Sequence, residues 1–99
     1  TTLFTTSPDG QRIAYERIGT GPALVLLHGG GSSRREWHTA GYVKRLQDEF
    51  TLIPIDLRGH GESAAPTDPG DYTIDKMMGD VLAVADACGV ERFTLWGFS

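Results

Sequence analysis

The chain has 99 residues and a formal net charge of −4, and its nine basic side chains are scattered along the sequence. This distribution excludes the basic stripe of a nucleic-acid-binding protein. With 39% hydrophobic and 22% charged residues the composition is that of an ordered globular protein, and the length allows at most one small domain. The longest apolar run, residues 23–27, is far shorter than the roughly 20 residues of a transmembrane helix, so no membrane contact is predicted. A single cysteine, Cys88, cannot close an internal disulfide, and we expect a cytoplasmic protein.

The sequence of residues 1–27 predicts three strands. Strand-like runs at residues 3–5 and 12–18 flank the turn sequence SPDG, in which proline presets one backbone angle and glycine supplies a positive φ. We therefore expect an N-terminal β-hairpin. Residues 23–27 are apolar without alternation, which is typical of a parallel strand covered on both faces.

A glycine-rich loop, HGGGSS, follows this strand and leads into a predicted helix. Ser33 and Glu36 have the spacing of a capping box, although Gly41 weakens the first turns. Three apolar residues fall on one face of this helix: Val43, Leu46 and Phe50. We interpret Arg34 and Arg35 as solvated charges in its first turn, with the anchoring of an acidic substrate as the alternative.

The second half of the chain predicts a strand, a loop, a helix and a strand. Residues 51–55 have the pattern of a buried strand, with Pro54 near the end, where its missing N–H matters less. After a long loop over residues 56–71, Thr73 can cap a helix that Gly89 ends. The apolar positions of this helix follow the helical period: Ile74, Met77, Met78, Val81, Leu82, Ala85 and Cys88. We interpret both methionines as core residues, and residues 93–96 as the last strand.

This order of elements indicates an α/β fold with an N-terminal hairpin, a parallel sheet and flanking helices. In such sheets functional groups gather at the carboxyl ends of the strands, because the connecting loops and helix N-termini meet there. Three loops would share that edge: HGGG at residues 28–31, DLRGHG at 56–61 and GFS at 97–99.

With their flanking residues, these blocks resemble the first half of an α/β-hydrolase. LLHGGGSS at residues 26–33, IDLRGHGES at 55–63 and LWGFS at 95–99 occur in the order and at the spacing of that family. The similarity covers essentially the whole chain. It implies that residues 1–99 are the N-terminal portion of a single α/β-hydrolase domain, with strands 1–5 of the expected sheet, and that the remainder of the domain is absent from this sequence.

The resemblance implies that Ser99 is the catalytic nucleophile. Gly97-Phe98-Ser99 is similar to the opening of a nucleophile elbow, a sharp turn from a strand to a helix that lifts the serine hydroxyl above the sheet. A small residue at position 97 would be needed because a side chain would collide within that turn. An ordinary Gly-x-Ser turn is the alternative interpretation, and the two upstream blocks favour the nucleophile.

The HGGG loop is similar to an oxyanion hole. The resemblance implies that the N–H of Gly30, with Gly31 as a second candidate, and the N–H of the residue after Ser99 hold the oxyanion of a tetrahedral intermediate. Glycine suits this role because the backbone itself must approach the ligand. Gly29, Ser32 and Trp37 are candidate binding residues. A glycine-rich turn with only a structural role is the alternative.

Four residues would support the site structurally: His28, Asp56, Arg58 and His60. In this family the triad follows the chain order Ser, Asp or Glu, and His, so we expect the base downstream and interpret His28 as a hydrogen-bond partner of the loop backbone. His60 would brace the site through backbone and ion-pair contacts. His38 could be exposed or could line the pocket. The spacing of the three histidines matches no compact set of metal ligands, and neither a metal nor an organic cofactor is predicted.

The sequence therefore predicts a serine hydrolase that acts on an ester, thioester, lactone or related acyl compound through an acyl-enzyme. Its partners would be this small-molecule substrate and the missing C-terminal part of the same protein. Residues 1–99 alone would be inactive, because a serine without its base is a weak nucleophile. Residues 93–96 would form an unpaired apolar edge.

Several alternatives stay open on the sequence alone. The fold also serves lyases, cofactor-free oxygenases and ligand receptors, and an inactive interaction module is a further alternative. The serine at position 99 disfavours the dehalogenase and epoxide hydrolase branches, whose nucleophile is a carboxylate. A nucleotide-binding Rossmann-like domain would explain the strand, glycine loop, helix, strand and acid at Asp56. The dinucleotide-binding pattern G-x-G-x-x-G is not matched from Gly29 onward, because Arg34 stands where the third glycine belongs.

Overall fold

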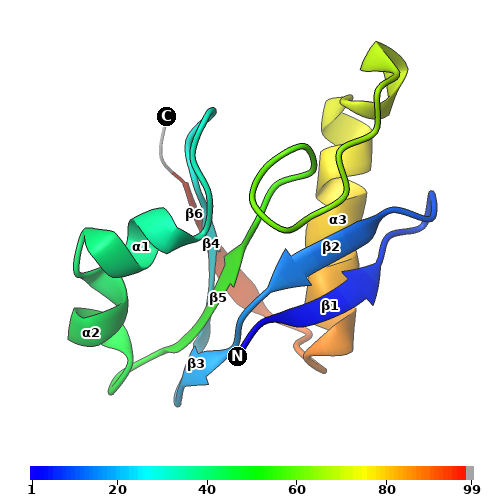
Figure 1. Ribbon diagram of the computed structural model, residues 1–99. Coiled ribbons are helices and arrows are strands. Elements are labelled where there is room, and N and C mark those ends of the chain that lie inside the picture. Colours follow the sequence, from blue (N-terminus) through cyan, green and yellow to red (C-terminus); the bar gives the residue numbers. More distant parts are fainter. Residues whose placement is uncertain (98–99) are drawn as a thin grey trace.

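The computed structural model describes residues 1–97, which form a mixed β-sheet with helices on both faces (Figure 1). The strands are β1 (Leu3–Thr6), β2 (Arg12–Tyr15), β3 (Ile18–Gly19), β4 (Ala23–Leu27), β5 (Thr51–Ile55) and β6 (Phe93–Gly97). The helices are α1 (Arg35–Thr39), α2 (Tyr42–Leu46) and α3 (Ile74–Ala87), with a 3₁₀ turn at Pro69–Asp71. The strands lie in the order β1-β2-β5-β4-β6, and β3 pairs with β5. This confirms the predicted α/β fold.

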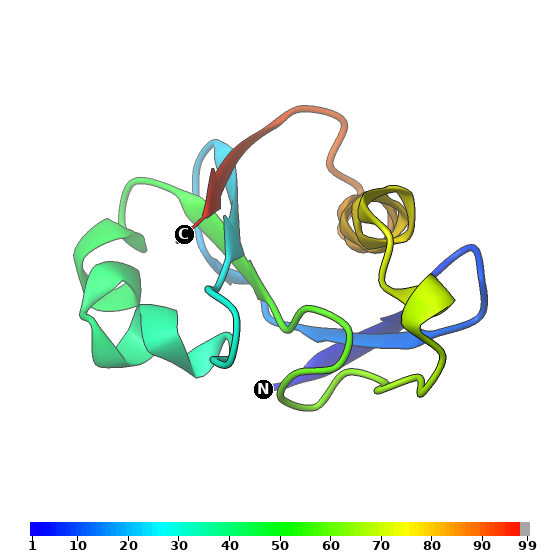
Figure 2. The same cartoon turned by 90° about the horizontal axis from the view of Figure 1, so that it is seen from above.

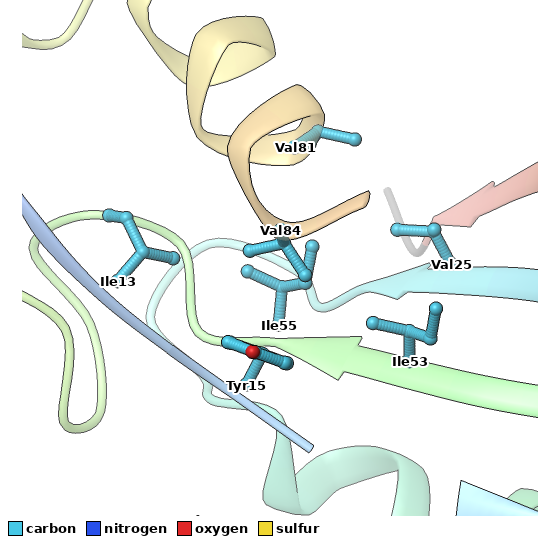
Figure 3. Close-up of a cluster of buried hydrophobic side chains, with 7 residues drawn as sticks. All are labelled: Ile13, Tyr15, Val25, Ile53, Ile55, Val81 and Val84. Carbon is cyan, nitrogen blue, oxygen red and sulfur yellow. The ribbon is translucent and has the colours of Figure 1, made fainter. Parts of the chain in front are cut away.

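The parallel strands β4 and β5 are buried on both faces, which explains their lack of alternation. Figure 2 shows α1 and α2 on one side of the sheet and α3 on the other. Figure 3 shows the buried cluster on the α3 side, formed by Ile13, Tyr15, Val25, Ile53, Ile55, Val81 and Val84. The cluster on the opposite side consists of Leu24, Leu26, Trp37, Val43 and Leu52. The sheet is therefore the middle of three layers.

The N-terminal hairpin forms as predicted, but the strand expected over residues 12–18 is divided into β2 and β3. The break lies opposite Pro54. The N–H of Glu16 donates to the Pro54 carbonyl at 3.0 Å, and proline has no N–H to return the bond. Pro54 thus interrupts the antiparallel ladder near the end of β5, while the parallel pairing with β4 continues on the other side.

The helix predicted after the glycine-rich loop is divided into the two short helices α1 and α2. The predicted capping box is wrong, because the Ser33 Oγ accepts the N–H of Arg35 at 3.3 Å and not that of Glu36. Gly41 adopts a φ of +85°, a left-handed conformation that ends α1 and redirects the chain into α2. Gly41 is therefore a boundary and not a weak point within one helix.

Helix α3 confirms the predicted element, and Thr73 caps it by accepting the N–H of Lys76 on its Oγ1 at 3.3 Å. One side of the helix packs on the sheet through Val81 and Val84. The prediction that both methionines are core residues is wrong, since Met78 is 39% exposed and Met77 is only half-buried. The sheet of the described residues reaches one narrow face of α3, and the outer part of the apolar stripe is left uncovered.

Strand β6 forms one edge of the described sheet, because its pairing there is with β4 alone. Leu95 and Trp96 are 43% and 42% exposed on this strand. Such an edge strand exposes unpaired backbone N–H and C=O groups together with apolar side chains. This arrangement agrees with the edge expected at residues 93–96. Among the described residues no helix is both long enough and apolar enough to cross a bilayer.

Candidate functional site

Two loops leave the sheet at the carboxyl edge of the parallel strands, where β6 also ends (Figure 1). Leu27, the last residue of β4, is paired with Ile55 at the end of β5 and with Gly97 at the end of β6. The β4 loop (residues 28–34) and the β5 loop (residues 56–63) therefore begin at the level where β6 ends. The predicted nucleophile, Ser99, lies outside the described residues.

Two glycine amides of the β4 loop, those of Gly29 and Gly30, have no hydrogen-bond partner among the described residues. The N–H of Ser32 donates to the Gly29 carbonyl at 3.2 Å, and the N–H of Gly31 donates to His60 Nε2, also at 3.2 Å. The N–H of Gly30 makes no hydrogen bond to any residue that the structure describes. A Cβ built at Gly30 would meet no atom of residues 1–97 within 4 Å. Of the two predicted oxyanion donors, one amide is thus uncommitted and the other is taken by a side chain.

His28 and His60 link the two loops, with their ring centroids 4.9 Å apart. His28 belongs to the β4 loop, and its Nε2 accepts the N–H of Leu57 in the β5 loop at 3.0 Å. His60 belongs to the β5 loop and accepts the Gly31 amide described above. On each ring, Nδ1 lies beside a backbone carbonyl, that of Gly29 at 2.7 Å or that of Arg58 at 3.1 Å. Because a carbonyl only accepts, these partners place the hydrogen on Nδ1 and make both rings neutral.

Burial favours the neutral form of His28. The ring is 2% exposed, and desolvation lowers its pKa, although the hydrogen bond to the Gly29 carbonyl acts in the opposite direction. Both ring nitrogens of His28 are bonded to backbone groups. This arrangement holds the β4 loop against the β5 loop and leaves neither nitrogen for proton transfer.

Asp56 is fully buried at the start of the β5 loop and binds both loops. Its Oδ1 accepts the backbone N–H of Arg34 at 2.7 Å, and its Oδ2 accepts the backbone N–H of Glu62 at 2.9 Å. The guanidinium of Arg34 forms an ion pair with the same carboxylate. Gly61 approaches so closely that a Cβ there would lie 2.3 Å from Asp56 Oδ2. The spacing of Asp56 and Gly61 in the sequence therefore reflects one compact turn around a buried carboxylate.

Arg34 is not the solvated charge that the sequence suggested. It is 6% exposed, and its guanidinium contacts the carboxylates of Glu16, Asp56 and Glu62. Burial acts to lower the pKa of Arg34, but the hydrogen bond to Glu62 and the charge of Asp56 outweigh it and raise the pKa. In return, Arg34 lowers the pKa of Glu62. Nothing in the local sequence separates Arg34 from Arg35. The available signal was Asp56, a carboxylate directly after a buried strand, which requires a cation nearby.

Arg58 is fully buried and anchors the β5 loop to α3 and to the hairpin turn. It donates to Asp80 from Nε at 2.8 Å and from Nη2 at 2.5 Å, and to Asp9 from Nη1 and Nη2 at 2.9 Å. Nη1 also donates to the Asp71 carbonyl at 2.7 Å, so every N–H of the guanidinium has an acceptor. These hydrogen bonds raise the pKa of Arg58, and Arg58 holds the pKa of Asp9 well below its usual range.

Two further residues that the sequence analysis discussed, Trp37 and His38, lie outside the β4 and β5 loops. Trp37 is 1% exposed in the cluster beneath α1 and α2, with the ring of Tyr42 at 5.3 Å, so it packs in the core. His38 is 40% exposed, and its Nε2 lies 3.2 Å from Glu16 Oε1. Within residues 1–97, no three His, Cys, Asp or Glu side chains are grouped to hold a metal ion.

Gly97 is not required by the strand that carries it. A Cβ at this position would lie 3.6 Å from the Leu27 carbonyl oxygen, which is an ordinary van der Waals contact. The steric argument made for this glycine therefore depends on the turn that follows, which lies outside the described residues.

Comparisons with known proteins point to one family. Residues 22–99 match the family model of the alpha/beta hydrolase fold. The chain is 32% identical over 95 residues to epoxide hydrolase 3 of Siraitia grosvenorii, covering 95% of this chain and 29% of that protein. It is 38% identical over 89 residues to 2-heptyl-3-hydroxy-4-quinolone dioxygenase AqdC2 of Rhodococcus erythropolis, covering 86% of this chain and 32% of that protein.

The solved structure of an epoxide hydrolase from an endophytic Streptomyces superimposes with a TM-score of 0.91 at 31% identity, covering 100% of this chain and 29% of that one. These similarities extend over nearly all of the chain. The chain spans a third or less of the length of these relatives.

Proposed function

The chain belongs to the α/β-hydrolase fold family, and we propose that it supplies the nucleophile and part of the oxyanion site of a serine hydrolase. In this reaction Ser99 attacks the carbonyl carbon of an ester, thioester, lactone or related acyl compound. The alcohol or thiol part leaves, and water then hydrolyses the acyl-enzyme. A histidine base and its orienting carboxylate, from outside these 99 residues, take the proton from Ser99 and return it to the leaving group.

The observation that carries the proposal is the pairing of Leu27 with Gly97 in adjacent parallel strands. Gly30 follows the first residue and Ser99 follows the second, each within three positions. The strands that lead to Gly30 and to Ser99 therefore end at neighbouring points of one edge of the sheet. The tetrahedral intermediate on Ser99 carries a negative oxygen, for which one fixed N–H donor is worth about 3–4 kcal/mol.

The side chains that join the two loops differ in the charge they bring near Gly30. The buried carboxylate of Asp56 pairs with the guanidinium of Arg34, which also pairs with Glu16 and Glu62. The rings of His28 and His60 are neutral and fully bonded to backbone groups. The two histidine rings therefore place no charge beside an oxyanion at the Gly30 amide.

Two relatives suggest other reactions. Epoxide hydrolysis is disfavoured despite the similarity to epoxide hydrolases, because Ser99 stands where a carboxylate nucleophile would be needed. An oxygenase reaction on a heteroaromatic compound is the second candidate, and the 38% identity to the dioxygenase AqdC2 favours it.

A substrate panel with matched variants tests the proposal. The complete gene product is assayed with p-nitrophenyl acetate and butyrate, a γ-lactone and styrene oxide, and oxygen uptake is measured with a 3-hydroxy-4-quinolone. We expect hydrolysis of the ester or the lactone, and a loss of at least about 10³-fold in Ser99→Ala. Quinolone-dependent oxygen uptake without ester hydrolysis would instead support the second candidate.

Gly30→Ala separates the oxyanion site from the fold. The added methyl group meets no described atom within 4 Å, so the variant is expected to fold, but the group enters the space assigned to substrate. We expect activity to fall by about 10²-fold. Gly70→Ala is the control, because its Cβ would lie at an ordinary 3.4 Å from Asp68 Oδ1. Equal activity of both variants would remove Gly30 from the site.

A further inference from the structure

The β4 and β5 loops exchange hydrogen bonds reciprocally through their histidines. His28 reaches from the β4 loop to the N–H of Leu57, and His60 reaches from the β5 loop to the N–H of Gly31. The partners of the second bond are 29 positions apart in the sequence. This bond occupies the Gly31 amide, while the neighbouring amide of Gly30 has no hydrogen-bond partner among the described residues.

We propose that His60 is a positioning residue for acyl transfer: by accepting the Gly31 N–H, it holds the β4 loop so that the Gly30 amide is the one presented to the oxyanion. This inference rests on the proposed function, since acyl transfer is the reaction that develops this charge. It also assigns different roles to the two glycines, because Gly31 serves as an anchor and Gly30 as the donor.

The composition of the loop makes this one bond important. Three consecutive glycines, Gly29 to Gly31, restrict the backbone less than any other residues would. Gly31 itself adopts a φ of +77°. Apart from the His60 bond, this segment is held by the short turn between the Ser32 N–H and the Gly29 carbonyl and by the ring of His28. A donor contributes fully to catalysis only when its geometry is fixed before the charge appears.

His60 is itself held in place. Its Nδ1 donates to the carbonyl of Arg58, two residues earlier, at 3.1 Å. The side chain of Arg58 is fixed by Asp80 on α3 and by Asp9 in the hairpin turn. On its other side, the imidazole lies against the ring of His28. A continuous set of bonds therefore extends from α3 through the β5 loop to the Gly31 amide.

The test compares three histidine variants of the complete gene product in steady-state hydrolysis of p-nitrophenyl acetate. His60→Ala removes the bond to Gly31, and we expect kcat to fall at least about tenfold while KM changes less than about twofold. In His60→Gln the amide oxygen can accept the Gly31 N–H and the amide nitrogen can donate to Arg58, so kcat should return to within about threefold of the wild type. His38→Ala, at an exposed histidine paired with Glu16, should match the wild type.

A second measurement follows the bond without catalysis. Hydrogen exchange of the Gly31 amide, observed by ¹⁵N NMR, should be faster in His60→Ala than in the wild type and slow again in His60→Gln. His60→Asn, whose amide is too short to reach Gly31, replaces the alanine variant if that one does not fold.

The outcomes separate the two proposals. Unchanged kcat and unchanged Gly31 exchange in His60→Ala overturn the positioning role alone, as does a loss of kcat that His60→Gln does not restore. A folded wild type that hydrolyses none of the acyl substrates overturns the proposed function and, with it, the role assigned to His60.

Discussion

Arg58→Met removes the cation on which the β5 loop depends and retains a side chain of similar length. The side chain of Asp80, its partner on α3, is 2% exposed, and that of Asp9, its partner in the hairpin, is 28% exposed. The substitution leaves Asp80 as a buried carboxylate without its cation, and breaking a buried pair in this way costs about 3–5 kcal/mol. Urea unfolding of the complete gene product, followed by circular dichroism, measures the free energy of unfolding.

A double-mutant cycle separates the charge pair from the packing around it. Arg58→Met with Asp80→Leu removes both buried charges, and we expect it to be more stable than Arg58→Met alone by roughly 2 kcal/mol, because apolar groups can replace a buried pair at little cost. Lys76→Met is the control. It breaks a partly exposed pair with Asp71 and should cost less than about 1 kcal/mol. A cost below about 1 kcal/mol for Arg58→Met, or simple additivity in the double variant, would refute this reasoning.

Three further predictions concern the support of the loops. Burial holds the pKa of His28 in the folded protein below its ordinary 6.5. As the pH falls below 6.5, the unfolded chain therefore takes up a proton before the folded protein does. The stability that the neutral ring contributes is lost as the pH falls through the folded-state pKa. The midpoint of urea unfolding should fall more steeply with acidification in the wild type than in His28→Gln, and equal slopes would contradict this. Gly61→Ala should cost on the order of 3 kcal/mol, because its Cβ meets the Asp56 carboxylate, whereas Gly10→Ala, with a positive φ in open space, should cost about 1 kcal/mol by the same measurement. Thr73→Ala removes the cap of α3 and should cost about 1 kcal/mol in thermal unfolding, and an unchanged Tm would show that the cap contributes nothing.

The central strands could be predicted from the sequence because burial on both faces leaves a strong local pattern. The runs at residues 23–27 and 51–55 match β4 and β5 at both ends. Helix α3 was equally accessible, since its cap at Thr73 and its stop at Gly89 enclose a regular apolar period. The errors arose where one residue changed the backbone locally. Pro54 divided the second strand of the hairpin, and Gly41 divided the first helix.

The candidate site was less accessible, because its contacts join loops that are distant in the sequence. The motifs predicted that the glycine loop and the DLRGHG loop lie at one edge of the sheet, and the register of β4, β5 and β6 agrees with this prediction. They could not show that Arg34 is buried on Asp56, or that His60 occupies the Gly31 amide. A hydrogen-bond partner 29 positions away has no local signature. The same limit explains why Met78 was assigned to the core, since the period of a helix shows which residues share a face but not what covers that face.

The central claim is that Ser99 is a nucleophile activated at an oxyanion site, and covalent labelling tests it most directly. The folded complete gene product is treated with a fluorophosphonate, digested, and mapped by mass spectrometry. We predict one adduct, on the peptide that contains Ser99, absent in Ser99→Ala and formed more slowly in Gly30→Ala. A folded protein that hydrolyses acyl substrates while Ser99 stays unlabelled, or that keeps its activity in Ser99→Ala, would contradict the account.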